Sequence, residues 1–352
     1  MGIIRLLLAI SIVFAHAGRP FGYEIITSKV AIQSFYIISG FYMTLVLNEK
    51  YIFGKDSYRI FIINRFLRIY PVYWIVLVLI CIEIFIHCDR NILYCFNYPV
   101  SSSSINTAIS SLQYFLKNIF LFISVTYFTP SSLSFGFFLV PFSWTLGVEL
   151  LYYLIAPFFV RRKLKIILIL ILLSYITRIL VFKYNNLESE GFVYLNMWFL
   201  PSELMFFLFG TISYKIYVQI RRMTIPNYIY ALSSMFLVLF TLMFSYIIQL
   251  FPQGEGIVGW LYYLSVLLSI PFLFNYTKMN KFINSFGELS YPIYISHSLM
   301  ILLLPIGLVG VDKNVYPLFV LFLTIIFSFV LRMLIEIPIE KIRQKNLRRK
   351  YN

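Results

Sequence analysis

Long apolar segments, separated by short polar stretches, follow one another along the whole chain. A transmembrane helix needs about 20 predominantly apolar residues, because an α-helix rises 1.5 Å per residue across a hydrocarbon core of about 30 Å. No polar stretch between the segments is long enough for a soluble domain. The pattern therefore predicts an all-α membrane bundle. Its apolar segments are residues 3–17, 30–47, 71–87, 112–128, 138–159, 164–182, 193–214, 228–250, 257–275, 289–309 and 316–337.

The cations between these segments indicate which of them cross. If segment 112–128 does not cross, about ten spans remain, and the cation-rich stretches fall on one side together with both termini. That side carries Lys50, Lys55, Arg59, Arg65, Arg68, Arg161, Arg162, Lys163, Lys165, Lys215, Arg221, Arg222, Lys278, Lys281 and the basic C-terminal residues. The positive-inside rule makes it cytosolic. We expect both termini in the cytosol and a re-entrant or interfacial helix near 112–128, which is tolerated where it packs against protein. Residues 1–340 then form one membrane domain, and 341–352 a basic cytosolic tail.

Composition agrees with a membrane protein. Hydrophobic residues make up 61% of the chain and charged residues 12%, whereas soluble domains are nearer half apolar and a quarter charged. The mean hydropathy is +0.85. The net charge of +15 would suggest nucleic acid in a soluble protein, but here the cations lie in short loops between spans. We therefore expect the lipid bilayer, and no nucleic acid, as a partner.

The N-terminus and the cysteines have alternative interpretations. Ala15-His16-Ala17 after an apolar run resembles a signal-peptide cleavage site, but the same run also serves as the first span, which we expect. Cys81, Cys88 and Cys95 match no zinc pattern, and we expect no metal. A disulfide between Cys88 and Cys95 requires that their loop face an oxidising space.

Ionisable residues inside spans are costly and are therefore functional candidates. The candidates are His16, Glu83, Glu149, Arg178, Glu203, His297, Arg332 and Glu336. His16 lies roughly 16 Å along its helix from Arg5. Glu149 lies on a span that runs the opposite way, so both side chains are expected in the outer half of the bilayer. A histidine oriented by a carboxylate is a common general base. The alternatives are a packing hydrogen bond for His16 and, for Glu149, a pair with a buried cation such as Arg178.

A second group lies where a cytosolic stretch enters a span, in Asn64-Arg65-Phe66-Leu67-Arg68-Ile69-Tyr70-Pro71. Arg65 and Arg68 are three residues apart and share a helix face. Two guanidiniums at one point bind phosphate or diphosphate well. The alternative is a pair of arginines that anchor the helix at the membrane edge.

Several motifs resemble the acyltransferase-3 family of integral membrane acyltransferases, in the family order and over most of the chain. They are RLLLAISIVFAH from Arg5 to His16, FYIISGFYM around Ser39, NRFLRIYPVYW from Asn64, PFSWTLGVELLYYLIAP from Pro141, LPSELMFFLFG ending at Gly210, FGELSYPIYISH ending at His297, and EIPIEKIR from Glu336. The sequence departs from the family where Ala31-Ile32-Gln33 replaces a glycine and an acidic residue, and where Glu149-Leu150 replaces paired acids.

The resemblance implies functional roles for several of these residues. Arg5 and His16 match the motif required for transfer, and Arg65 and Arg68, followed by Tyr70, match the residues held to bind coenzyme A. Glu149 matches the acidic residue of the tryptophan motif. Four further residues are candidates for binding the acceptor, with helix packing or an ion pair as the alternative for each: Trp144, Arg178, Glu203 and His297.

We therefore expect a multi-pass enzyme of the bacterial cytoplasmic membrane. The resemblance implies transfer of an acyl group, with acetyl expected and succinyl as an alternative, from cytosolic acyl-CoA to a hydroxyl of a lipid-linked or polymeric surface glycan. His16 is the expected base and Glu149 its expected partner, with direct transfer and an acyl-histidine intermediate both open. A glycan flippase and a many-span glycan polymerase are the alternatives. Failure to consume acyl-CoA would favour the first, and altered chain length without altered acylation the second.

Overall fold

The computed structural model describes residues 1–51, 57–87, 115–121, 138–187, 195–251 and 254–351. Within these residues the chain is helical and contains no strand, which confirms the predicted all-α class. The longer helices are α1 (Gly2–Ala17), α2 (Ser28–Glu49), α3 (Ser57–Ile86), α7 (Trp144–Phe159), α8 (Leu164–Leu187), α10 (Leu200–Ile220), α11 (Asn227–Leu250), α12 (Glu255–Thr277), α13 (Lys281–Leu303), α15 (Tyr316–Leu331) and α16 (Ile337–Tyr351). The shorter elements are η1 (Pro20–Gly22), α9 (Leu195–Trp198), α14 (Ile306–Val309) and a π turn, η4 (Arg332–Glu336).

Six of the described helices are long and apolar enough to cross a membrane, and α1 and α7 are shorter apolar helices. The number of spans and the side of the termini remain predictions. Of segment 112–128, only residues 115–121 are described, and they lie against α3: Tyr73 donates to the carbonyl of Asn118 at 2.5 Å and Trp74 to that of Ile119 at 3.1 Å. Cys88 and Cys95 lie outside the described residues.

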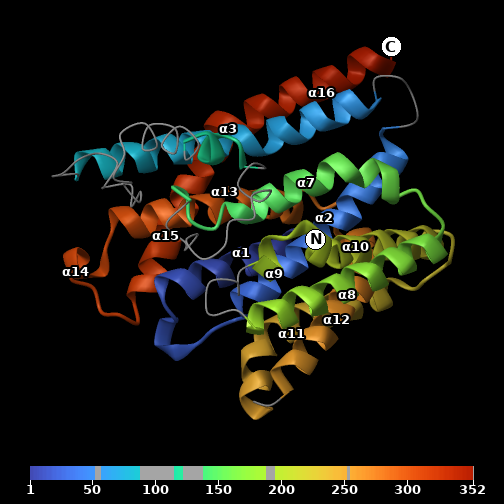
Figure 1. Ribbon diagram of the computed structural model, residues 1–352, viewed down its shortest axis with the longest axis horizontal. Helices are drawn as coiled ribbons and strands as arrows, with labels where there is room; N and C mark the ends of the chain where they lie inside the picture. Colours follow the sequence, from blue (N-terminus) through green and yellow to red (C-terminus); the bar gives the residue numbers. More distant parts are fainter. Residues whose placement is uncertain (52–56, 88–114, 122–137, 188–194, 252–253, 352) are drawn as a thin grey trace.

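The bundle is built around α2, with other helices at its periphery (Figure 1). In the most apolar 18-residue stretch of α2, 83% of the residues are buried inside the protein, compared with 11% in α8 and 17% in α11. The exposed face of α8 is made of leucine and isoleucine, including Leu168, Leu172 and Leu180. So large an apolar surface is unstable in water, and it fits contact with lipid.

Glycines set the closest helix contacts. A Cβ atom built on Gly40 of α2 would lie 1.9 Å from the carbonyl oxygen of Phe207, and one on Gly210 of α10 would lie 2.0 Å from that of Ile37. One helical level further on, the hydroxyls of Thr44 and Thr211 hydrogen-bond at 3.0 Å. Gly40 lies beside Phe207, and Thr44, four residues later, lies beside Thr211. The two helices therefore run in the same direction.

α1 and α13 also run in the same direction in close contact. Gly2 packs on Gly287, and a Cβ atom on Gly287 would lie 2.5 Å from the Cα atom of Gly2. Further along both helices, His16 meets His297. α1 ends at Ala17 and is capped by Gly18, whose φ of 118° is one that side chains rarely adopt. The glycine pair thus determines which residues of α13 lie level with His16.

Beyond α15 the chain passes through the π turn into α16, which packs along α3 (Figure 1). Arg332, within the turn, pairs with Glu288 of α13 and donates to Ser285. Arg332 is thus paired with another helix, and no ion pair between Arg332 and Glu336 is present among the described residues. Residues 341–351, predicted as a basic tail, continue α16 and are held beside the bundle.

Candidate active site

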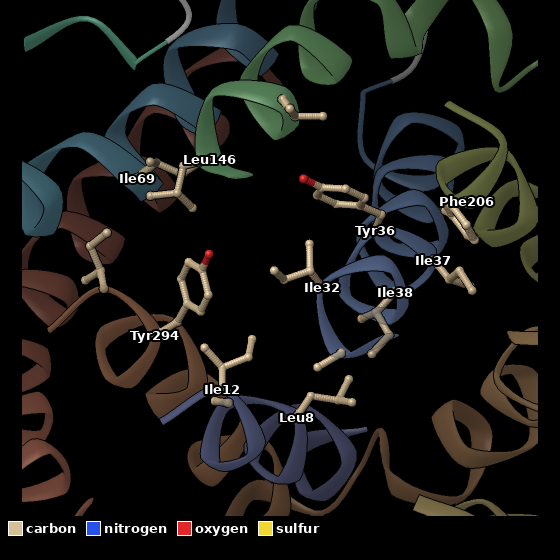
Figure 2. Close-up of a cluster of buried hydrophobic side chains, with 14 of the residues drawn as sticks. Leu8, Ile12, Ile32, Tyr36, Ile37, Ile38, Ile69, Leu146, Phe206 and Tyr294 are labelled. Atoms are coloured by element: carbon tan, nitrogen blue, oxygen red, sulfur yellow. The ribbon is translucent and has the colours of Figure 1, made fainter. Parts of the chain in front are cut away.

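A cavity of about 90 Å³ lies among α1, α2, α3, α7 and α13. It has room for a few waters or a short acyl group, since one water takes about 30 Å³ of liquid volume. Figure 2 shows the hydroxyls of Tyr36 and Tyr294 turned toward the space between Ile32, Ile69 and Leu146, all of which line the cavity. The hydroxyl of Tyr36 is buried and has no hydrogen-bond partner. The remaining polar lining includes Arg5, Ser39, Tyr42, Arg68, Glu149, Tyr153 and Thr145.

The cavity has an excess of positive charge. Arg5 of α1 and Arg68 of α3 both line it, and Arg5 hydrogen-bonds with Tyr42. Among the described residues, neither arginine forms an ion pair with a carboxylate. Glu149, which also lines the cavity, balances only part of this charge, and the remaining positive charge in a largely buried site favours a bound anion.

Arg65 and Tyr70 do not line this cavity, although they belong to the same motif as Arg68. Arg65 is 4% exposed, and its guanidinium carbon lies 5.4 Å from the ring centre of Phe61 and 6.0 Å from that of Tyr153. Its Nε atom has no hydrogen-bond partner. Tyr70 is buried and stacks on Phe66. Arg68 therefore lines the cavity and Arg65 does not, although both guanidiniums lie near Tyr153 and interact with each other. That the two act together on one ligand remains a prediction.

A further arginine lies nearby that the sequence analysis placed in the tail. Arg343 of α16 pairs with Glu340 at 2.5 Å, and its charge lies close enough to Arg65 and Arg68 to interact with both. Its Nε atom is buried without a partner. The contact between α16 and α3 brings these arginines together, and nothing in their sequence spacing indicated it.

The carboxylate of Glu149 accepts hydrogen bonds from two cavity residues. Ser39 of α2 donates to it at 2.6 Å, and Tyr153, one turn further along α7, also donates. Glu149 thus joins α2 to α7 beside Arg68. Glu149 and Tyr153 share a helix face, so their pairing was readable from the sequence, whereas the contact with Ser39 was not.

His16 pairs with His297 and not with Glu149, which corrects the predicted catalytic pair. Nδ1 of His16 lies 3.2 Å from Nε2 of His297. The His16 ring also stacks on Phe142, with ring centres 3.6 Å apart. Glu149 lies five residues into α7 from Trp144, or about 7.5 Å along the helix, whereas Phe142 precedes the helix. The two side chains are at different depths because α7 begins only beyond Phe142.

Phe142 is held in an unusual backbone conformation. Its φ is 68°, a left-handed value that is strained for an aromatic residue and often marks a functional site. Its carbonyl accepts hydrogen bonds from the hydroxyls of Tyr294 at 3.0 Å and Thr145 at 3.1 Å. Tyr294 and Thr145 line the cavity, so one aromatic residue separates its end from His16. Sequence analysis gave Phe142 no role.

Two predicted acceptor-binding residues are buried away from the cavity. Trp144 is 4% exposed, and its ring lies 5.9 Å from that of Trp198. Its indole nitrogen has no hydrogen-bond partner. His297 is fully buried. Neither side chain lines the cavity, so substrate contact by either one would require the surrounding helices to open.

The remaining two, Arg178 and Glu203, form a buried ion pair between α8 and α10. Gln33 of α2 donates to both carboxylate oxygens of Glu203, at 3.2 and 3.3 Å, and accepts from Tyr263 of α12. Glu203 is therefore already bonded to two neighbours. Gln33 stands where the family has an acidic residue, and a second carboxylate there would face Glu203. The arrangement ties together four helices, so the prediction that this pair binds the acceptor is not supported.

We expect the Arg178–Glu203 pair to contribute to stability and not to substrate binding. Arg178→Met should destabilise the protein by about 3–5 kcal/mol, because it leaves a buried carboxylate uncompensated. The double variant Arg178→Met/Glu203→Met should lose less stability than Arg178→Met, because it leaves no buried charge unpaired. Thermal unfolding in detergent measures the stability of both variants. The control is Arg19→Met, which should change stability little because the Arg19 side chain of the Arg19–Glu24 pair is largely exposed. A double variant less stable than Arg178→Met would contradict this view.

Comparison with known families identifies the family of the chain. Residues 1–333 match the model of the acyltransferase domain, Acyl_transf_3. The chain belongs to this acyltransferase family. The resemblance found in the sequence motifs is thereby confirmed. No curated protein and no solved structure matches the chain. Membership in the Acyl_transf_3 family, with the apolar helices, makes the protein a multi-pass membrane acyltransferase.

Proposed function

We propose that the protein transfers an acyl group, with acetyl expected, from cytosolic acyl-CoA to a hydroxyl of a surface glycan such as O-antigen, capsule or exopolysaccharide. One observation carries the proposal. Among the described residues that line one cavity, Arg5 and Arg68 outnumber the single carboxylate, Glu149, and at Tyr294 and Thr145 the same cavity reaches Phe142, which stacks on His16. An anion-binding region and a histidine are thus joined through one space in an acyltransferase fold.

The donor fits this space by charge and shape. The phosphates of acyl-CoA would bind Arg5 and Arg68, with Arg65 and Arg343 adding positive potential on the same side of the bundle. The partly apolar cavity of about 90 Å³ suits a short acyl group, and the larger pantetheine arm would require the surrounding helices to move apart. The thioester would then lie beyond Tyr294, near Phe142 and His16.

His16 is the proposed general base. Its ring nitrogen takes the proton of the acceptor hydroxyl while the hydroxyl oxygen attacks the thioester carbonyl carbon. The carbon–sulfur bond then breaks, and the coenzyme A thiolate leaves and takes up a proton, so that an ester and a free thiol are formed. Glu149 holds Ser39 and Tyr153 in the cavity wall and balances the charge of Arg68; it does not orient His16.

The acceptor is proposed to reach His16 from the outer side of the bacterial cytoplasmic membrane. His16 lies near the end of α1 opposite Arg5 and is partly exposed. The glycan class follows from the family resemblance and not from a residue in this cavity.

A gene deletion in the host tests the function. The deletion should remove ester-linked acetate from the purified surface glycan, as seen by NMR before and after mild alkali, and the wild-type gene should restore it. A glycan that keeps its acetyl groups but loses length would indicate a polymerase. One that keeps its acetyl groups but fails to reach the surface would indicate a flippase.

Arg68→Ala should raise the KM for acyl-CoA and lower kcat/KM roughly 10- to 100-fold, the effect of losing hydrogen bonds to a charged group. The matched control is Arg59→Ala, which removes the same charge from an exposed position on the same helix. Initial rates with purified protein in lipid nanodiscs measure both. Equal donor kinetics in the two variants would exclude Arg68 from the donor site.

A further inference from the structure

His297 has properties that neither substrate binding nor simple packing explains. It is fully buried and lies outside the cavity, yet both of its ring nitrogens lie within hydrogen-bond distance of specific groups. Nδ1 lies 2.6 Å from the carbonyl oxygen of Tyr294, and Nε2 lies 3.2 Å from Nδ1 of His16.

These two contacts determine where the hydrogens lie. A carbonyl oxygen only accepts, so Nδ1 of His297 carries a hydrogen and donates it to Tyr294. In a neutral imidazole the other nitrogen, Nε2, then has the lone pair and accepts. The hydrogen in the contact between the two histidines must therefore come from Nδ1 of His16. As a result, Nε2 of His16 holds a lone pair and is free to act as a base.

The carbonyl of Ile12, one turn earlier in α1, is a second acceptor beside the His16 ring. The imidazole of His297 is the more basic of the two acceptors, so it stabilises the positive charge that forms when His16 takes a proton.

Tyr294 supports both sides of the His16 ring. Its main-chain carbonyl fixes His297, and its hydroxyl donates to the carbonyl of Phe142, whose ring stacks on His16. The same hydroxyl lies 2.6 Å from that of Thr145. One residue of α13 thus positions the groups on both sides of His16.

We propose that His297 is a positioning residue that holds His16 as the tautomer with its lone pair on Nε2 and stabilises the imidazolium formed during transfer. The proposal rests on the proposed function, in which His16 is the base. His297 itself does not touch the substrate.

Two substitutions distinguish the roles of the two ring nitrogens of His297. In His297→Gln the side-chain amide oxygen reaches the place of Nε2 and still accepts from His16. In His297→Asn the shorter amide replaces Nδ1, still donates to Tyr294, and leaves His16 without this acceptor. We expect His297→Asn to lower kcat roughly 10- to 100-fold with the KM for acyl-CoA unchanged, and His297→Gln to retain most of the activity.

Nitrogen NMR tests the tautomer without any activity measurement. The chain contains three histidines, so the spectrum of protein labelled with ¹⁵N-histidine has three rings, assigned with His87→Gln and His297→Gln. We expect His16 in wild type to be neutral with its hydrogen on Nδ1, and to populate both tautomers in His297→Asn.

Either measurement can overturn the proposal. A wild-type His16 with its hydrogen on Nε2 contradicts it, even if the variants fail to fold. Equal losses of kcat in folded His297→Gln and His297→Asn contradict it as well, since a packing role would not distinguish them. If wild-type protein transferred no acyl group while His16 showed the expected tautomer, the proposed function would fail and the histidine geometry would stand.

Discussion

Replacing His16 by glutamine should lower the rate of acyl transfer by about 10²- to 10⁴-fold, the contribution of a general base. Glutamine retains polarity near the site but cannot take a proton from the acceptor hydroxyl. Arg5 and Arg68 line the cavity and His16 does not, so binding of acyl-CoA should be unchanged. Transfer of labelled acetyl in proteoliposomes measures the rate, and equilibrium binding of a non-transferable acyl-CoA analogue measures affinity.

The matched control for this substitution is His87→Gln. His87 is exposed at the end of α3 and pairs only with Glu83 among the described contacts, so its loss should leave the rate unchanged. A His16→Gln variant with wild-type rate would exclude His16 as the base. Incubation of wild type with labelled acyl donor and no acceptor distinguishes direct transfer from an acyl-histidine intermediate. Label that stays on His16 indicates the intermediate, and unlabelled protein indicates direct transfer.

The second large effect is expected at the contact between α2 and α10. Gly40→Ala and Gly210→Ala should each prevent or severely weaken folding, although alanine normally favours a helix over glycine by about 1 kcal/mol. The new Cβ atom would lie about 2 Å from a carbonyl oxygen of the facing helix, and a backbone atom cannot move away as a side chain can. Overpacking typically costs about 1–3 kcal/mol and more where the backbone must shift.

Gly259→Ala is the matched control for the glycine substitutions. A Cβ atom there would lie 3.9 Å from a methyl group of Val30, which is ordinary contact. We expect Gly259→Ala to be neutral or slightly stabilising. Fluorescence-detected size-exclusion chromatography after heating in detergent compares the three variants. Wild-type stability in Gly40→Ala or Gly210→Ala would contradict the close approach of the two helices.

Polar contacts between helices depend on the glycines that let those helices approach closely: Gly40 and Gly210 between α2 and α10, and Gly2 and Gly287 between α1 and α13. Close approach of α2 to α10 brings Gln33 to Glu203, and close approach of α1 to α13 brings His16 to His297. Small residues allow such approach in membrane proteins, where apolar side chains gain little by leaving lipid. Loss of a glycine contact should therefore disturb chemistry several helical turns away.

The sequence by itself determined the helices and the motif residues they carry. Apolar segments predicted the helical class without strands, because a backbone in hydrocarbon must satisfy its own hydrogen bonds. The rise per residue placed His16 far from Arg5 along α1. The motifs from Arg5 to Glu336 predicted the acyltransferase family, which the family match confirmed.

Only the tertiary structure decided which side chains meet. His16 was expected beside Glu149 and lies against His297. Arg68 lines the cavity and Arg65 does not, and Arg343 of the C-terminal helix lies near both. The reason is physical. A helix that faces lipid on one side and protein on the other is apolar all round, so hydropathy does not say which face turns inward. That choice is made by glycine contacts and polar pairs between helices distant in sequence, and these exist only once the bundle has formed.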